Sequence, residues 1–215
     1  MKIVFSYSLD KDVENFIKSS QSVNNKNLTK FQEAYIKKFG DDYDPIKVKS
    51  FIESYNKENK IDFDVVTAEI EKKWQTIENE FIRRAESVFG PYPFDVLVYL
   101  STNSRCTYNI SQNYFFVFIG GEHTNAIIMH ELWHFYTWNM LHADLVKEGI
   151  SPEQYNDIKE SLTELLNLEC KDLLGGHEDR GYPQHAAMRG LIREIWAKDK
   201  DIKNLIARLT KIPFE

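Results

Sequence analysis

His130, Glu131 and His134 are the residues of this sequence whose types and spacing could carry out chemistry. They follow the pattern HExxH, in which the two histidines lie four positions apart. On an α-helix such side chains share one face, about 6 Å apart along the axis, so both imidazoles can bind one tetrahedral ion at ~2.0–2.1 Å. Glu131, one position round the helix, is then placed beside a water molecule on that ion. The spacing therefore predicts a site for one Zn²⁺ per chain.

The residues around this motif are uncharged on every side of the expected helix. Apolar and aromatic residues occupy 126–129, 132–133 and 135–136. A helix on the surface of a globular protein is apolar along one stripe only, so this segment is expected to lie in the protein interior. Charged groups buried there need compensation, which a bound metal ion supplies.

The chain downstream of this motif is acidic, which favours the binding of a divalent cation. Residues 131–180 contain 11 Asp and Glu against 4 Lys and Arg, a balance of −7. The helix expected over 152–174 contains three glutamates, Glu153, Glu160 and Glu164. Glu160 and Glu164 lie almost opposite the apolar stripe of that helix, so the helix must be covered on both sides if either one binds the metal.

The HExxH segment, with an aromatic strand expected just before it at 114–119, resembles the zincin metallopeptidases. The metzincin branch would continue with glycine three residues and histidine six residues after His134, where this chain has Thr137 and Met140. His142 cannot replace that histidine, because it lies two turns beyond His134. The chain is therefore more similar to the gluzincins, the thermolysin-like branch, whose third ligand is a glutamate on a second helix.

This resemblance implies that Glu160 is the third ligand. The run Glu160-Ser161-Leu162-Thr163-Glu164 matches the gluzincin order of glutamate, small residue, aliphatic, hydroxyl residue and acid. Glu153 has the more familiar spacing from His134, but its neighbours do not match, and Glu164 is the other alternative. If Glu160 is the ligand, Glu164 is expected to accept the Nδ1 proton of a ligand histidine and so to fix its tautomer.

The resemblance also implies a further group that stabilises the oxyanion. His185 is the best candidate, because it lies in a loop that opens the helix expected over 184–198. Tyr182 in the same loop is the reserve. His123 and His177 stand among glycine and acidic residues and are expected to be exposed.

Periodicity predicts a helix-rich α+β protein with a small mixed sheet just before the active-site helix. We expect one zincin-like domain over 1–215, with a helical N-terminal part over 1–90 and with the sheet, the active-site helix and the ligand helix over 91–215. Strands are expected at 96–100, 114–119 and, as a third, 106–110. The expected helices cover 28–39, 46–55, 63–89, 124–142, 152–174, 184–198 and 201–210.

Composition excludes several classes of protein. The net charge of −6 argues against a nucleic-acid partner, which needs a basic face, and no apolar run approaches the ~20 residues that cross a bilayer. The first ten residues reach an acidic residue too soon for a secretory signal. Cys106 and Cys170 are far apart and form no CxxC pair. We expect a cytoplasmic monomer with neither a nucleic-acid nor a membrane partner.

Together these features predict a zinc metallopeptidase that hydrolyses peptide or protein substrates, with Glu131 as the general base. Two alternatives remain at this stage. One is a zinc hydrolase that acts on a non-peptide amide. The other is a non-catalytic binding module that zinc stabilises.

Overall fold

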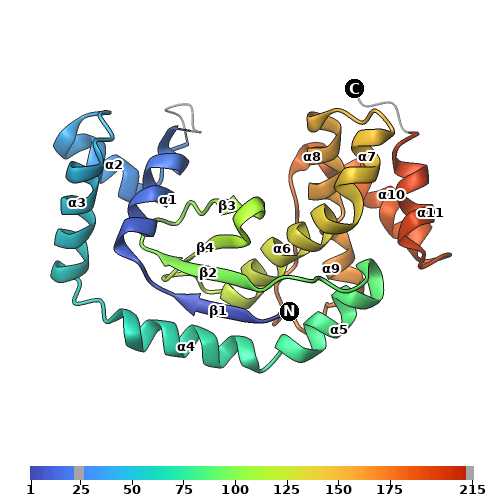
Figure 1. The fold of residues 1–215 in the computed structure, drawn as a ribbon, viewed down its shortest axis with the longest axis horizontal. Helices are drawn as coiled ribbons and strands as arrows, with labels where there is room; N and C mark the ends of the chain where they lie inside the picture. Colours follow the sequence, from blue (N-terminus) through green and yellow to red (C-terminus); the bar gives the residue numbers. More distant parts are fainter. Residues whose placement is uncertain (22–26, 212–215) are drawn as a thin grey trace. The chain divides into compact units, whose positions relative to one another are not determined.

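The computed structural model describes residues 1–21 and 27–211. This part of the chain is α+β, mostly helical with one small mixed sheet, which confirms the predicted fold class (Figure 1). Contacts divide the chain into two compact units. Unit 1 comprises Met1–Trp74 and Phe94–Thr124, and unit 2 comprises Gln75–Pro93 and the chain from Asn125 onward.

Unit 1 contains the sheet, whose strands run in the order β1-β2-β4-β3. Strands β1, β2 and β4 run parallel to one another, and β3 pairs antiparallel with β4. The central strand β4 is the most apolar and is buried along most of its length. The strands are β1 (Ile3–Ser6), β2 (Val96–Ser101), β3 (Tyr108–Asn109) and β4 (Tyr114–Phe118).

The strand β1 lies in the segment that we expected to be helical. Ile3 pairs with Val96, so the partner strand is 93 residues away in sequence. Four residues with alternating burial give too short a pattern to separate a strand from a helix start. The N-terminal part is therefore not helical throughout.

The helices of unit 1 begin and end at residues that favour such ends. Thr29 and Gln32 form a capping box at the start of α2, and Gly40 ends this helix with φ 78°. Asp44 and Pro45 begin α3. Buried apolar side chains of α1, α2 and α3 form one cluster: Val13, Phe16, Tyr35, Val48 and Ile52. The helices of this unit are α1 (Leu9–Gln21), α2 (Lys30–Phe39), α3 (Pro45–Glu58) and α4 (Phe63–Gln75).

The helix expected over 63–89 is interrupted. It consists of α4 and α5, with Thr76 and Ile77 between them in a turn. The boundary between the units follows Trp74, so the residues before and after the turn belong to different sets of contacts. The apolar spacing continues through the turn, so periodicity alone does not reveal this interruption.

Unit 2 is helical and contains the HExxH segment. Its helices and helical turns are α5 (Glu78–Phe89), α6 (Thr124–Thr137, which starts one residue before the boundary), η2 (Trp138–His142), α7 (Ala143–Lys147), α8 (Pro152–Ser161), α9 (Glu164–Glu169), η3 (Pro183–His185), α10 (Ala186–Trp196) and α11 (Ile202–Leu209).

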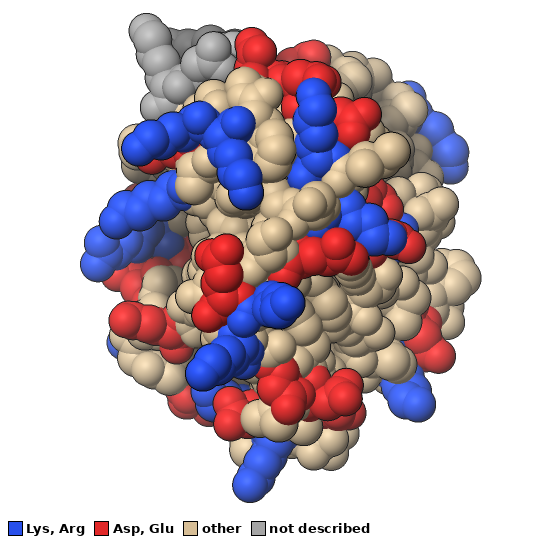
Figure 2. Space-filling view, turned by 90° about the vertical axis from the view of Figure 1, so that its left-hand side faces the viewer, with Lys and Arg blue, Asp and Glu red and all other residues tan. Residues whose placement is uncertain are grey.

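Charged side chains of both signs share the face shown in Figure 2. This is the side of the molecule at the left of Figure 1, and lysine and arginine alternate there with aspartate and glutamate (Figure 2). No helix in 1–21 or 27–211 combines the length and the apolar character that a membrane span requires.

Candidate metal centre

Helix α6 carries His130 and His134 on one face within unit 2. Its neighbouring side chains are buried as the apolar sequence predicts, and Trp133 packs edge-on against Phe89 of α5 with 4.9 Å between ring centroids. His134 is only 2% exposed. The Nε2 atoms of the two histidines are 2.9 Å apart. The helix therefore presents both imidazoles to one point, as the four-residue spacing requires.

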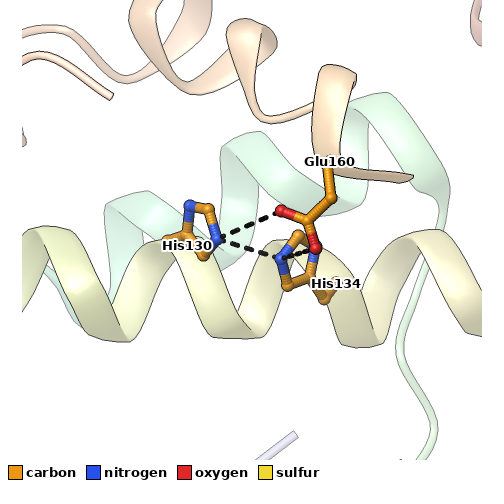
Figure 3. A group of neighbouring side chains, drawn as sticks. All are labelled: His130, His134 and Glu160. Atoms are coloured by element: carbon orange, nitrogen blue, oxygen red, sulfur yellow. Dashed lines mark hydrogen bonds and ion pairs between the residues drawn. The ribbon is translucent and has the colours of Figure 1, made fainter. Parts of the chain in front are cut away.

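Helix α8 brings Glu160 to the same point. Ser151 and Gln154 form a capping box at its start, and Glu160 lies near its end. Its carboxylate lies 3.5 Å from His134 Nε2 through Oε1 and 3.9 Å from His130 Nε2 through Oε2 (Figure 3). Of the three candidate glutamates, Glu160 is the one that lies with the histidines. Glu153 is exposed at the start of α8, where its Oε2 accepts a hydrogen bond from the Ser151 hydroxyl.

The donor atoms of His130, His134 and Glu160 fit a bound zinc ion. They all lie within 4.8 Å of one another. Ligands bound tetrahedrally at ~2.0–2.1 Å are separated by roughly 3.3–3.4 Å, a value that the three observed separations of 2.9, 3.5 and 3.9 Å bracket. Two imidazoles and one carboxylate form the donor set of catalytic zinc sites, whereas structural sites use four protein ligands.

The predicted helix over 152–174 is interrupted at Leu162 and Thr163, after α8 ends at Ser161. Thr163 Oγ1 lies 2.8 Å from the Glu160 carbonyl oxygen, and the Trp133 indole donates to the Leu162 carbonyl at 2.9 Å. Side chains thus bond carbonyl groups near the end of α8, and the next helix, α9, starts at Glu164. A continuous helical wheel places Glu160 and Glu164 on the same side, but Glu160 lies at the histidines and Glu164 lies at α10.

Glu164 does not have the role that we expected. Its two carboxylate oxygens pair with Arg189 and Arg193 of α10, at 2.8 and 2.9 Å. The carboxylate at a ligand histidine is instead that of Asp179, whose Oδ2 is 2.6 Å from His130 Nδ1. Our assignment of Glu164 as the acid that fixes the histidine tautomer is therefore wrong, because two arginines of α10 hold its carboxylate.

Asp179 lies in the loop between α9 and η3, and several polar contacts hold it. Its backbone N–H donates to the Asn167 side chain at 2.9 Å, and its carbonyl oxygen accepts from the Asn167 amide at 2.7 Å. Arg189 also donates to that carbonyl oxygen. Gly181 permits this arrangement, because it has φ +61° and a Cβ there would lie 2.8 Å from the Arg189 guanidinium.

Sequence reasoning missed Asp179 as a functional residue. It stands at no fixed helical spacing from the motif, and only the acidic character of 131–180 includes it. Contacts made by the loop, rather than any local pattern, bring it to His130.

The charges of the centre shift several pKa values. Burial alone would raise the pKa of the Glu160 carboxyl, but the contacts with His134 and Lys159 outweigh it and lower the pKa far below its usual value. Burial likewise opposes ionisation of Asp179, but His130 lowers its pKa overall. Burial and the charge of His130 lower the pKa of His134 to about 3. Both carboxyl groups are thus ionised near neutral pH, and His134 is neutral.

The tautomer of His130 follows from these charges. An ionised carboxylate only accepts hydrogen bonds, so Nδ1 of His130 carries the proton that is shared with Asp179. Burial opposes a charge on His130, but the contacts with Asp179 and Glu131 outweigh it and raise the pKa of this ring. Once the ring is neutral, with its proton on Nδ1, the lone pair is on Nε2, the atom that faces His134 and Glu160. The contact with Asp179 thus prepares His130 to bind a metal through Nε2.

Glu131 is the remaining polar side chain of the motif. Its Oε2 is buried and has no hydrogen-bond partner in the described residues. Burial raises the pKa of its carboxyl, while the nearby charges of His130 and Lys159 offset part of that shift. A buried polar atom left without a partner is uncommon, and it indicates that a group absent from the protein chain, such as water, completes the site.

His185 and Tyr182 lie at the start of α10. His185 is buried, with 4% exposure, and its Nε2 is 2.9 Å from Asp157 Oδ1 on α8. Tyr182 is 55% exposed and meets the His185 ring edge-on. The structure thus places His185 in contact with Asp157 and Tyr182, and its side chain is buried. Its predicted role at an oxyanion stays a prediction.

His142, which the spacing excludes as a ligand, stacks on Trp138 within the π-helical turn η2. His123 and His177 are exposed as expected.

Comparisons of this chain with protein-family models, with characterised proteins and with solved structures found no match.

Proposed function

We propose that this protein is a zinc-dependent peptidase. The observation that carries the proposal is the convergence of His130, His134 and Glu160 beside Glu131, a buried carboxyl with an unpartnered oxygen. Three protein ligands are the number that catalytic zinc sites use. Peptide or protein substrates, no nucleic-acid or membrane partner, a monomeric state and a cytoplasmic location are parts of the same proposal. The low cysteine content supports that location.

The proposed metal would be held by Nε2 of His130, Nε2 of His134 and the Glu160 carboxylate. When bound, zinc would supply Lewis-acid chemistry, polarising a carbonyl group and making water a better nucleophile. Asp179 keeps the proton of His130 on Nδ1, so the Nε2 lone pair stays directed at the ion. The buried apolar side chains beside the motif on α6 lower the local dielectric constant, which strengthens the electrostatic interactions within the site.

Glu131 performs the proton transfers in this proposal. Its carboxylate accepts a proton from the attacking water molecule and later donates it to the departing amine. The unpartnered Oε2 is the atom available for this exchange.

The proposal is tested by metal content together with peptide turnover. Purified protein should contain about one zinc per chain and cleave a mixture of unstructured peptides. Glu131→Gln should keep the zinc and lower turnover roughly 10²–10⁴-fold, the scale of a lost general base. Glu122→Gln, which changes an exposed carboxyl just before α6, is the matched control and should leave both unchanged.

The alternatives give different results in the same experiment. Zinc without cleavage of any peptide would indicate either a hydrolase of a non-peptide amide or a module that zinc only stabilises. A loss of zinc in Glu131→Gln, or unchanged turnover, would contradict the role of Glu131.

A further inference from the structure

A buried lysine lies within the candidate metal centre, where a cation beside the proposed zinc ion is unexpected. Lys159 is 2% exposed, and its Nζ is 2.6 Å from Glu160 Oε1. The same Oε1 is the oxygen that lies 3.5 Å from His134 Nε2. Lysine is almost never fully buried unless its charge is paired. The ammonium therefore uses the ligand carboxylate as a counter-charge.

The contact between Lys159 and Glu160 does not follow from their adjacency in sequence. Neighbouring side chains on a helix diverge by about 100° and do not face each other. The lysine stem must therefore bend toward the face of α8 that carries Glu160. The charge of Lys159 offsets part of the rise in the pKa of Glu131 and adds to the fall in the pKa of His134. The ammonium therefore interacts with several groups of the centre.

A metal ion and this ammonium would compete for the same oxygen. A carboxylate oxygen binds zinc at ~2.0–2.2 Å. With Nζ 2.6 Å from that oxygen, an ion on Oε1 would lie no more than about 4.8 Å from the ammonium. Like charges at that separation in a buried site repel strongly. Either the ammonium leaves Oε1 when the metal binds, or the metal binds more weakly.

We propose that Lys159 is the internal counter-cation of the metal-free centre, which bound zinc displaces from Glu160, and that it thereby lowers the affinity of the protein for zinc. This inference rests on the zinc site of the proposed function. In the metal-free protein the ammonium compensates the buried Glu160 carboxylate and keeps that side chain in place. Competition for Oε1 then makes zinc uptake and release easier than for the same three ligands without a lysine.

The test compares zinc binding of the wild type and Lys159→Met, which keeps the length of the side chain and removes its charge. Zinc dissociation constants are measured by competition with a chromophoric chelator, and thermal unfolding is followed with and without zinc. Lys159→Met should bind zinc at least roughly tenfold more tightly. Its metal-free form should unfold at a lower temperature, because Glu160 is left buried without its counter-charge. Zinc should therefore raise its unfolding temperature more than it raises that of the wild type.

Two further variants serve as controls. Lys159→Arg keeps the charge and should retain the weaker binding of the wild type. Lys171→Met removes the charge of an exposed lysine in unit 2 and should change neither the zinc dissociation constant nor the unfolding temperature.

A second measurement applies if metal-free Lys159→Met does not fold. Zinc-loaded protein is mixed with excess chelator, and the rate of zinc release is recorded without need of a stable metal-free form. Release from Lys159→Met should be roughly tenfold slower. Release at an equal or a higher rate would overturn the inference.

The outcomes separate this inference from the proposed function. Zinc in the wild type, bound no more tightly by Lys159→Met, would overturn this inference alone. Zinc in Lys159→Met but none in the wild type would support the competition and overturn the zinc-dependent function of the natural protein. Zinc in neither protein would overturn both.

Discussion

Oδ2 of Asp179 lies 2.6 Å from Nδ1 of His130, although the two residues are 49 positions apart in the chain. A carboxylate behind a metal-binding histidine fixes the tautomer of the ring and increases its basicity. Thr163 and Arg189 hold the same carboxylate, with Thr163 Oγ1 2.9 Å and an Arg189 nitrogen 3.2 Å from Oδ1. The orientation of His130 thus depends on residues from α10 and from the junction of α8 and α9.

Asp179→Asn should weaken zinc binding roughly 10–100-fold, the range for loss of a carboxylate behind a ligand histidine. The neutral amide cannot hold the proton on Nδ1 as an ionised carboxylate does. Competition with a chelator measures the change, and Glu178→Gln, an exposed neighbour, is the control. Equal zinc affinities of Asp179→Asn and the wild type would show that the contact between Asp179 and His130 does not strengthen zinc binding.

Glu160→Gln should lose most of its zinc affinity, whereas Glu153→Gln should keep it. The free energy of binding at a structural zinc site is about 10–16 kcal/mol over four ligands. The loss of one ligand therefore corresponds to a decrease in zinc affinity of roughly 10²–10³-fold. Both variants change a glutamate of α8, but Glu160 lies at the histidines and Glu153 is exposed. Metal titration decides between them, and the reverse result would assign the ligand to Glu153.

Acid should destabilise the metal-free protein through His134. Its pKa is about 3 in the folded protein, lowered by burial and by the charge of His130, against about 6.5 when unfolded. Between these values the unfolded chain binds more protons, so the free energy of unfolding falls as pH falls, by up to about 1.4 kcal/mol per pH unit from this residue. The contribution of His134 is fully present above pH 6.5.

Denaturant unfolding of metal-free protein between pH 7 and pH 4 measures this effect. His134→Gln should show a shallower dependence on pH than the wild type, even if it is less stable at every pH. His177→Gln, which changes an exposed histidine, should keep the slope of the wild type. An unchanged slope in His134→Gln would contradict the lowered pKa.

His185→Ala should lower the free energy of unfolding by about 1–3 kcal/mol, because it removes a buried partner of Asp157. Asp157→Asn should lower the free energy of unfolding by a smaller amount. In the double variant the two losses of free energy should be less than additive. Zinc affinity should stay unchanged in both. If His185→Ala instead keeps its stability and loses turnover, the oxyanion role predicted from the sequence is correct.

The sequence alone determined the local part of this site. The spacing of His130 and His134 depends only on the period of a helix, and the apolar residues around them imply burial wherever that helix lies. The starts of α3 and α8 could be predicted for the same reason, since Asp44-Pro45 and Ser151-Pro152 act within one turn. Features of this kind depend only on residues within a few positions of one another, so the sequence alone is enough to predict them.

The tertiary structure decided everything that depends on distant partners. The spacing left three glutamates open, and the position of α8 beside α6 brings Glu160 to the histidines. Helix α8 ends at Ser161, and Glu164 at the start of α9 pairs with Arg189 rather than with a histidine. Strand β1 forms only by pairing with β2, 93 residues away. Asp179 reaches His130 through a loop that Asn167 and Arg189 hold, a contact for which no spacing in the sequence provides a signal.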